Sequence, residues 1–210
     1  MLLLLCLSLL IIAVFIPKEA GAFSLTPELK KEIAEKKIAV EAAEKKATDE
    51  KKTADPFVYF DLAMTYAYSN KIEEGWALLK KVHEQDKQYA PKMIKKYVPL
   101  IKADPSNWKN RIRLAFSLFF DNQKEKAIEE LQGIETMDPK NIWALAYQAL
   151  IYGEEEKIDK GILLTKKALK IDNDVSSLHY LLGTAYIKKG WQLKGYTEIA
   201  EALRLKALGH

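Results

Sequence analysis

The sequence predicts an all-helical protein built from a repeated helix-turn-helix unit. Two sets of small residues each recur three times with a period of 34 residues: Ala115, Ala149 and Gly183, and Ala127, Gly161 and Gly195. Segments with a 3.6-residue apolar period, rich in Lys, Glu, Leu and Ala, dominate the chain, and strand-like runs are scarce. A fixed period of this length is the signature of a repeat array, in which each unit buries its apolar face against its neighbours.

The small residues of the repeat have a packing role. The two helices of a hairpin approach to about 8 to 10 Å, so the closest positions need side chains as small as Ala or Gly. Asp104-Pro105 and Asp138-Pro139 separate successive units, because Pro ends one helix and fits the first turn of the next. The sequence therefore predicts successive hairpins over residues 108–141, 142–175 and 176–208.

The last unit resembles a tetratricopeptide repeat, a helix-turn-helix of 34 residues. The run Leu182-Gly183-Thr184-Ala185-Tyr186 matches that motif, with Gly190, Gly195 and Ala202 at the offsets that it requires. The small residues at positions 8 and 20 of the motif are present in all three units, and Pro139 supplies the position-32 proline in one of them. The resemblance implies a right-handed superhelix of stacked hairpins with a concave binding face.

A fourth unit precedes these three, over residues 56–89 of a repeat domain that we place at residues 55–208. Ala63 and Gly75 lie twelve residues apart, as the later pairs of small residues do. Ala63 lies 52 residues before its next equivalent, so 18 residues have been added. Residues 91–104 supply this addition as one inserted helix, which contains a proline. Because helices alternate between two layers in such an array, we expect one added helix to turn the first hairpin relative to the other three.

Residues 1–22 have the features of an export signal or a membrane anchor. An apolar run over residues 2–16 precedes the small-x-small site Ala20-Gly21-Ala22. The run is shorter than the roughly 20 residues that a membrane-spanning helix needs, so we favour export to the periplasm or cell envelope with cleavage after Ala22. The alternative is an uncleaved anchor that contacts the membrane through residues 1–17.

Residues 23–54 change in composition to Lys, Glu and Ala and predict a charged helix. A thin apolar stripe, broken by Lys36, runs along it: Leu25, Leu29, Ile33, Val40, Ala43 and Ala47. A coiled coil between two chains needs three to four sustained heptads, and this stripe falls short of that length. We therefore expect a solvated spacer helix.

Composition argues against several classes of function. The chain has 33 basic and 29 acidic residues, mixed along its length, which does not indicate nucleic-acid binding. The three histidines, His83, His179 and His210, lack metal-ligand spacing, and the single cysteine, Cys6, lies in the predicted signal. The repeat explains the glycines, so they do not indicate a phosphate loop. We expect no catalytic site, metal or cofactor.

The tetratricopeptide resemblance implies a groove lined by positions 2, 5, 9, 12 and 13 of each unit. These positions hold a largely apolar and aromatic set: Phe57, Phe60, Met64 and Tyr68; Lys109, Ile112, Phe116, Phe119 and Phe120; Trp143, Ala146 and Leu150; Tyr180, Thr184, Ile187 and Lys188. Such a surface suits a helix or extended segment of a partner, although the same side chains could instead pack against neighbouring helices. Phe60 and Met64 replace the Lys and Asn with which family members bind chaperone tails, so that partner is not expected.

The predicted last helix adds a second candidate surface. Tyr196, Ala200, Leu203 and Ala207 form an apolar stripe on it, where terminal repeats normally carry a polar face. This stripe predicts docking of a partner or self-association. Together, the two surfaces indicate a non-catalytic protein-interaction scaffold or adaptor of the cell envelope. The alternatives are a glycan-binding module, in which Trp143 and Tyr180 would stack on sugars, and a cytoplasm-facing, membrane-anchored assembly factor.

Overall fold

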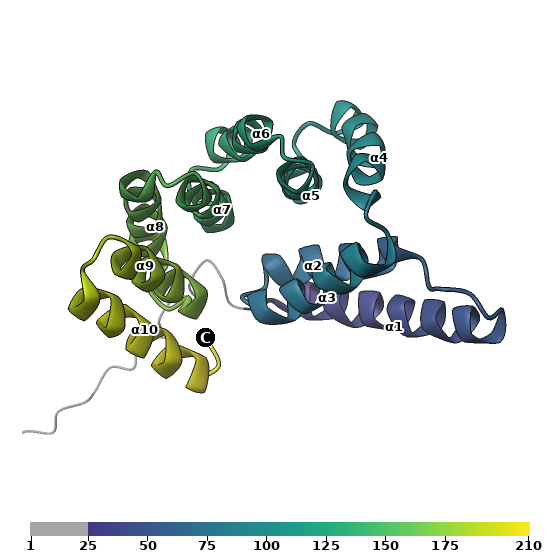
Figure 1. Cartoon of the computed structure of the whole chain (residues 1–210), viewed down its shortest axis with the longest axis horizontal. Helices are drawn as coiled ribbons and strands as arrows, with labels where there is room; N and C mark the ends of the chain where they lie inside the picture. Colours follow the sequence, from purple (N-terminus) through teal and green to yellow (C-terminus); the bar gives the residue numbers. More distant parts are fainter. Residues whose placement is uncertain (1–24) are drawn as a thin grey trace, which may run out of the picture.

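The computed structural model describes residues 25–210, and this part of the chain is built from ten helices without a strand (Figure 1). The helices are α1 (Pro27–Asp49), α2 (Pro56–Ala67), α3 (Ile72–Gln85), α4 (Tyr89–Ala103), α5 (Trp108–Phe120), α6 (Lys124–Met137), α7 (Ile142–Glu154), α8 (Ile158–Ile171), α9 (Ser176–Lys188) and α10 (Gln192–Ala207). The all-helical prediction is confirmed. The predicted export signal or anchor lies outside the described residues.

Four helix pairs pack as hairpins, namely α2 with α3, α5 with α6, α7 with α8, and α9 with α10. The small residues lie where the paired helices cross. A Cβ atom added to Gly183 would lie 2.8 Å from the carbonyl oxygen of Gly195, and one added to Gly161 would lie 3.0 Å from that of Ala149. The 34-residue columns therefore mark closest approach between the two helices of a hairpin. Among residues 25–210, no helix has the length and apolar character needed to cross a membrane.

The three C-terminal hairpins form a continuous arc, because α6 packs on α7 and α8 packs on α9. The first hairpin does not continue that arc. The inserted helix α4 packs on α5, and Tyr89 and Tyr97 of α4 contact Phe60 of α2, with ring centroids 6.0 and 6.3 Å apart. As a result, α2 and α3 lie across the open side of the arch that runs from α4 to α10 (Figure 1). The single added helix has thus turned the first hairpin, as expected.

The N-terminal helix α1 packs along α2 and is not the solvated spacer that we expected. Ile33 and Val40 are buried in this contact. Lys36, which breaks the apolar stripe in the sequence, lies on the same side of α1 and pairs with Asp61 of α2. The stripe is thin because part of the contact is made by paired charges, which a count of apolar positions misses.

Candidate partner-binding surfaces

The predicted groove is largely filled. Seven of its positions are buried: Phe60, Met64, Tyr68, Ile112, Phe116, Trp143 and Ala146. Seven more are partly buried: Phe57, Lys109, Phe119, Phe120, Leu150, Thr184 and Ile187. Tyr180, with 58% of its surface exposed, and Lys188 are the groove positions most open to solvent, and both lie on α9. The groove positions most open to solvent therefore lie at the C-terminal end of the array.

The first hairpin fills the rest of the groove. Trp76 of α3 lies edge-on to Phe120 of α5, with ring centroids 5.9 Å apart. The Tyr147 hydroxyl on α7 donates to the carbonyl oxygen of Ala67, at the end of α2, over 2.6 Å. Phe116 packs edge-on against Tyr147 at 4.6 Å, which joins the two contacts into one layer. The turned first hairpin thus occupies the surface that the resemblance assigns to a partner.

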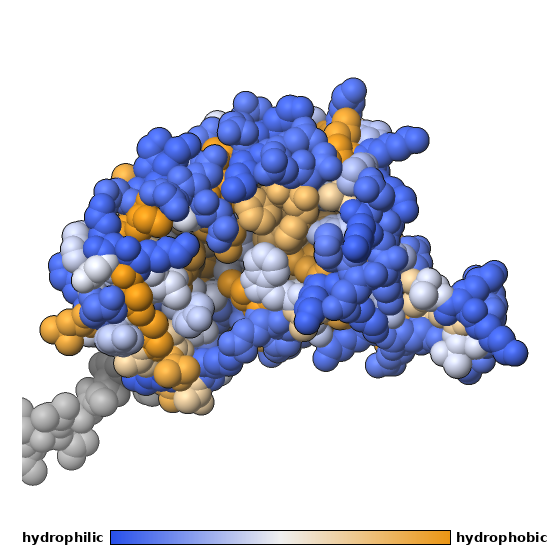
Figure 2. Space-filling model, viewed as in Figure 1, coloured by the Kyte–Doolittle hydropathy of each residue, from blue (hydrophilic) through white to orange (hydrophobic). Residues whose placement is uncertain are grey.

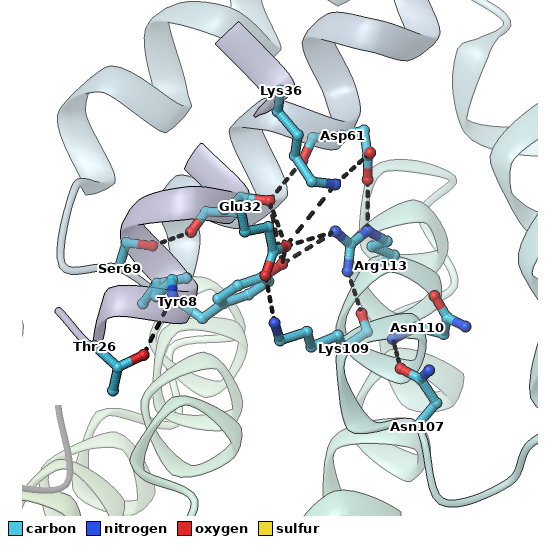
Figure 3. Close-up of polar contacts among 12 residues, drawn as sticks. Thr26, Glu32, Lys36, Asp61, Tyr68, Ser69, Asn107, Lys109, Asn110 and Arg113 are labelled. Atoms are coloured by element: carbon cyan, nitrogen blue, oxygen red, sulfur yellow. Dashed lines mark hydrogen bonds and ion pairs between the residues drawn. The ribbon is translucent and has the colours of Figure 1, made fainter. Parts of the chain in front are cut away.

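A cluster of charged and polar side chains joins α1, α2 and α5, and we call it the α1 clamp (Figure 3). Its members are Glu32, Lys36, Asp61, Tyr68, Lys109 and Arg113. Arg113 is 5% exposed; its Nε donates to Asp61 Oδ1 over 2.8 Å, and its Nη2 donates to the Tyr68 hydroxyl over 3.0 Å. Glu32 accepts hydrogen bonds from Tyr68 and from Lys109. Each charge in the cluster has an opposite partner.

The carboxylates of the α1 clamp are stabilised in their ionised form. Burial raises the pKa of Asp61, but the charge of Arg113 together with the hydrogen bond and charge of Lys36 outweighs it, so the pKa lies below its ordinary value. Burial also raises the pKa of Glu32, but hydrogen bonds from Lys109 and Tyr68 bring it below its ordinary value. Both groups are therefore charged at neutral pH and held by their partners. This arrangement fastens α1 and α2 to α5 as one structural block.

At the C-terminal edge of the array, two columns of the repeat change from buried to exposed residues. Ile128, Ile162 and Tyr196 lie 34 residues apart and are 8%, 7% and 61% exposed. A second pair of residues 34 positions apart shows the same change, since Leu169 is 9% exposed and Leu203 is 64% exposed. α7 packs on α6 and α9 packs on α8, which buries the earlier members of each column. The last members remain exposed on α10.

We call this exposed stripe the α10 face, and it consists of Leu193, Tyr196, Ala200, Leu203 and Ala207. Leu193 was not among the predicted edge residues, yet it is the most exposed of the large apolar residues there, at 82%. Figure 2 shows hydrophobic surface gathered in the lower left, where Figure 1 places α9 and α10. Exposed apolar patches at the end of an element commonly mark interaction sites.

The turn of the first hairpin contributes a helix cap that the sequence analysis did not identify. Asn107 and Asn141 each cap the helix that follows them, α5 and α7. Val175 takes the third place in this 34-residue column, before α9, and has no side-chain oxygen to accept a hydrogen bond. Asn70 supplies the missing acceptor from 107 residues away, since its Oδ1 accepts from the Ser177 backbone N–H over 3.2 Å. In the sequence, the replacement of Asn by Val at the third position of this column was the signal that α9 needs a cap from elsewhere.

Among residues 25–210, the side chains considered for metal or sugar binding have structural roles instead. Residues 25–210 hold no group of three His, Cys, Asp or Glu side chains arranged to bind a metal. Both ring nitrogens of His179 are engaged, Nδ1 with Glu198 at 2.7 Å and Nε2 with the Asn173 carbonyl at 3.0 Å, so this histidine joins α9 to α10. Trp143 is fully buried and stacks on Tyr147, and therefore does not offer a ring face to a sugar.

An arc of helical hairpins that cross at small residues defines a helical-repeat protein with a tetratricopeptide-like superhelix. No protein-family model matches the chain, and no curated protein matches it. Among solved structures, a crystal structure of MamA protein aligns with 82% of this chain and 92% of its own, at 19% identity and a TM-score of 0.51. TTC0263, a thermophilic TPR protein of Thermus thermophilus, aligns with 72% of this chain and 91% of its own, at 15% identity and a TM-score of 0.51. These likenesses confirm the predicted fold, a tetratricopeptide-like helical superhelix, and at such identities they show the fold alone.

Proposed function

We propose that this protein is a non-catalytic scaffold that binds another polypeptide, and that the α10 face is its docking surface. One observation carries the proposal. Ile162 and Leu169 on α8 are buried under the next helix. Tyr196 and Leu203, which hold the equivalent repeat positions on α10, are exposed. The α10 face therefore has the residues of an internal repeat interface. The partner that fits it is an amphipathic helix that packs as α9 packs on α8.

The composition of the α10 face suits such a helix. Burying Tyr196, Leu203 and Leu193 contributes about 1.5 to 3 kcal/mol for each large apolar side chain. Ala200 lies at the middle of the stripe, and its small side chain permits the close approach that helices make at their crossing point. Charged side chains border the stripe, including the ion pair between Glu201 and Arg204. An apolar centre with a polar rim is the usual composition of a protein interface.

The test uses the full chain and two leucine-to-lysine variants. Leu203→Lys places a charge in the α10 face, and the control Leu163→Lys changes an equally exposed leucine on α8, where 69% of its surface is accessible. Both variants should keep the circular dichroism spectrum of the parent. We expect a protein captured quantitatively from an envelope extract by the parent and by the control to be lost with Leu203→Lys.

Three further outcomes, from the capture, from light scattering and from glycan arrays, are decisive. If the same proteins are captured at the same yield with Leu203→Lys, the α10 face is not the docking surface. If light scattering instead shows that the parent doubles in mass at high concentration and that Leu203→Lys stays monomeric, the occupant is a second copy of this chain. Glycan-array binding that survives Leu203→Lys would favour the sugar-binding alternative through Tyr180.

We also propose that the scaffold works in the cell envelope. The support is the apolar run over residues 2–16 followed by Ala20-Gly21-Ala22. N-terminal sequencing of the natural protein tests this, and we expect it to start at Phe23. An uncleaved N-terminus on protein from the membrane fraction would show an anchor instead. An uncleaved N-terminus on protein from the cytoplasm would contradict export.

A further inference from the structure

The two ends of the array meet at the turn of the first hairpin. This turn, residues 67–70, contacts α7 through Tyr147 and α9 through Ser176 and Ser177. Asn70 makes a two-way contact, because its Nδ2 donates to Ser176 Oγ over 3.1 Å while its Oδ1 accepts from the Ser177 N–H. On the outer side, Lys206 of α10 pairs with Glu73 of α3 at 2.7 Å. These contacts close the superhelix into a ring.

The side of the ring that carries the turn is firmly built. Tyr68, within the turn, is fixed by the hydroxyl contact with Arg113 and packs edge-on to Trp108, with ring centroids 5.3 Å apart. The α1 clamp therefore holds α1, α2 and α5 together. The other side, α7 to α10, is a continuous stack with its own internal crossings. Between the two blocks the chain runs through the contact of α6 with α7.

The hydrogen bonds and the ion pair that close the ring are few, and they lie beside the ring contact of Phe116 with Tyr147. The Lys206–Glu73 pair is exposed on both side chains, at 59% and 80%, and such pairs contribute little. The Ser177 hydroxyl is buried at the contact and has no hydrogen-bond partner among the described residues. α9 also depends on this contact for its N-terminal cap, since Val175 cannot provide one. The joint between the blocks thus depends on a small number of specific polar contacts.

We propose that the turn at residues 67–70 is a latch that closes the array in cis, and that it covers a second interaction surface on the inner side of α7 and α9. Opening at the contact of α6 with α7 exposes Tyr147, the N-terminus of α9, and the surface that continues to Tyr180. The partner that fits this surface is a helix that ends as α2 does. Its last turn must offer a backbone carbonyl oxygen to the Tyr147 hydroxyl. It must also carry an Asn with a left-handed backbone conformation, whose side chain caps α9. This inference adds a regulated surface to the proposed scaffold and does not involve the α10 face.

The chain supplies matched variants for the test. Asn70 has a φ of 57°, and Asn122, at the equivalent turn between α5 and α6, has a φ of 59°. Glycine tolerates this conformation, so Asn70→Gly removes the side-chain contacts while the turn is kept. Tyr147→Phe removes the hydroxyl that bonds Ala67. The double variant Asn70→Gly/Tyr147→Phe is compared with the control Asn122→Gly/Tyr152→Phe, which changes the same residue types away from the latch.

The readout is the distance between spin labels at Lys80 on α3 and Lys188 on α9, both exposed, in the full chain with Cys6 replaced by Ser. We expect one narrow distance distribution in the parent and in the control, and a second, longer population in the double variant. A disulfide between Asn70→Cys and Ser176→Cys, whose native side chains are in contact, should keep the distribution narrow in the oxidised protein. Identical distributions in the double variant and the control would overturn the latch.

A peptide with the sequence of residues 55–71 tests the covered surface. We expect it to bind the single variant Asn70→Gly, which keeps the Tyr147 hydroxyl, at least tenfold more tightly than the parent, and an Asn70→Gly peptide to bind that variant less well. Equal affinity for the two proteins, including no binding to either, would overturn the assignment of this surface. Because neither measurement uses a residue of the α10 face, failure of the latch is distinguishable from failure of the proposed docking surface.

Discussion

Arg113 of α5, which is buried, and Asp61 of α2, which is partly buried, form an ion pair with Nε donating to Oδ1 over 2.8 Å. They are 52 residues apart in the sequence, and the pair ties the turned first hairpin to the repeat arc. The Nη1 of Arg113 also donates to the Lys109 carbonyl oxygen over 3.1 Å. The guanidinium therefore donates both to α2 and to its own helix, α5. One guanidinium therefore joins α2 to α5, beside the ring contacts of Phe60 with α4 and the Tyr147–Ala67 hydrogen bond.

Replacing Arg113 by Met should destabilise the protein strongly. The substitution keeps much of the side-chain volume and removes the buried guanidinium from Asp61, while Lys36 and Lys109 still pair with Asp61 and Glu32. We therefore expect a loss near the lower end of the about 3 to 5 kcal/mol that is typical of a broken buried ion pair. Urea unfolding followed by circular dichroism measures the change. Arg204→Met, at the exposed pair with Glu201, should leave the unfolding midpoint unchanged. Equal midpoints for Arg113→Met and the parent would contradict a structural role for the clamp.

The α1 clamp also predicts a loss of stability in acid. The pKa values of Glu32 and Asp61 lie below their ordinary values in the folded protein, so the folded state binds fewer protons than the unfolded chain. The stabilisation is complete above the ordinary carboxylate pKa, about 4, and is lost as the pH falls through the lower folded values. Glu32→Gln should flatten the decline of unfolding free energy as the pH falls below about 4.5. An unchanged slope would show that Glu32 is not part of this linkage.

The tight crossing in the last hairpin predicts an unequal response to two glycine substitutions. A Cβ at Gly183 would lie 2.8 Å from the Gly195 carbonyl oxygen and 2.8 Å from a carbon of Ile199. Gly183→Ala should therefore cost about 1 to 3 kcal/mol through overpacking. Gly153→Ala, in a helix with nothing within 4 Å of the new carbon, should be stabilising by up to about 1 kcal/mol. Thermal unfolding of both variants checks the sign of each effect, and a stabilised Gly183→Ala would show that the crossing is looser than described.

The hairpins could be predicted from the sequence because their spacing is local. Gly183 and Gly195 are twelve residues apart in one hairpin, and the need for small residues at their crossing repeats with the unit. The polar contacts of α1 could not be predicted in this way. Glu32 and Lys36 interrupt an apolar stripe, and their partners Asp61 and Lys109 come from helices far along the chain. No local pattern connects these residues.

The groove shows a second limit of the sequence pattern. The repeat register assigned Phe60 and Trp143 to a concave face, and both side chains are fully buried. The register places a residue on a face of its helix and does not state what lies against that face. The one added helix, α4, decides the outcome by sending the first hairpin back across the arc. At the α10 face, by contrast, the column of Ile162 and Tyr196 identifies an uncovered position directly.

The packing of α1 on α2 predicts that two isoleucines of one helix will differ sharply. Ile33 is 8% exposed and lies in the contact with α2, whereas Ile38 is 64% exposed. Ile33→Ala should lower the unfolding free energy by about 2 kcal/mol or more, because it removes buried methyl groups and leaves a cavity. Ile38→Ala, in the same helix, should change it by less than about 0.5 kcal/mol. Hydrogen exchange should show α1 losing protection in the first variant and keeping it in the second. Equal and small effects of the two substitutions would mean that α1 stands free of the array in solution, as a spacer would.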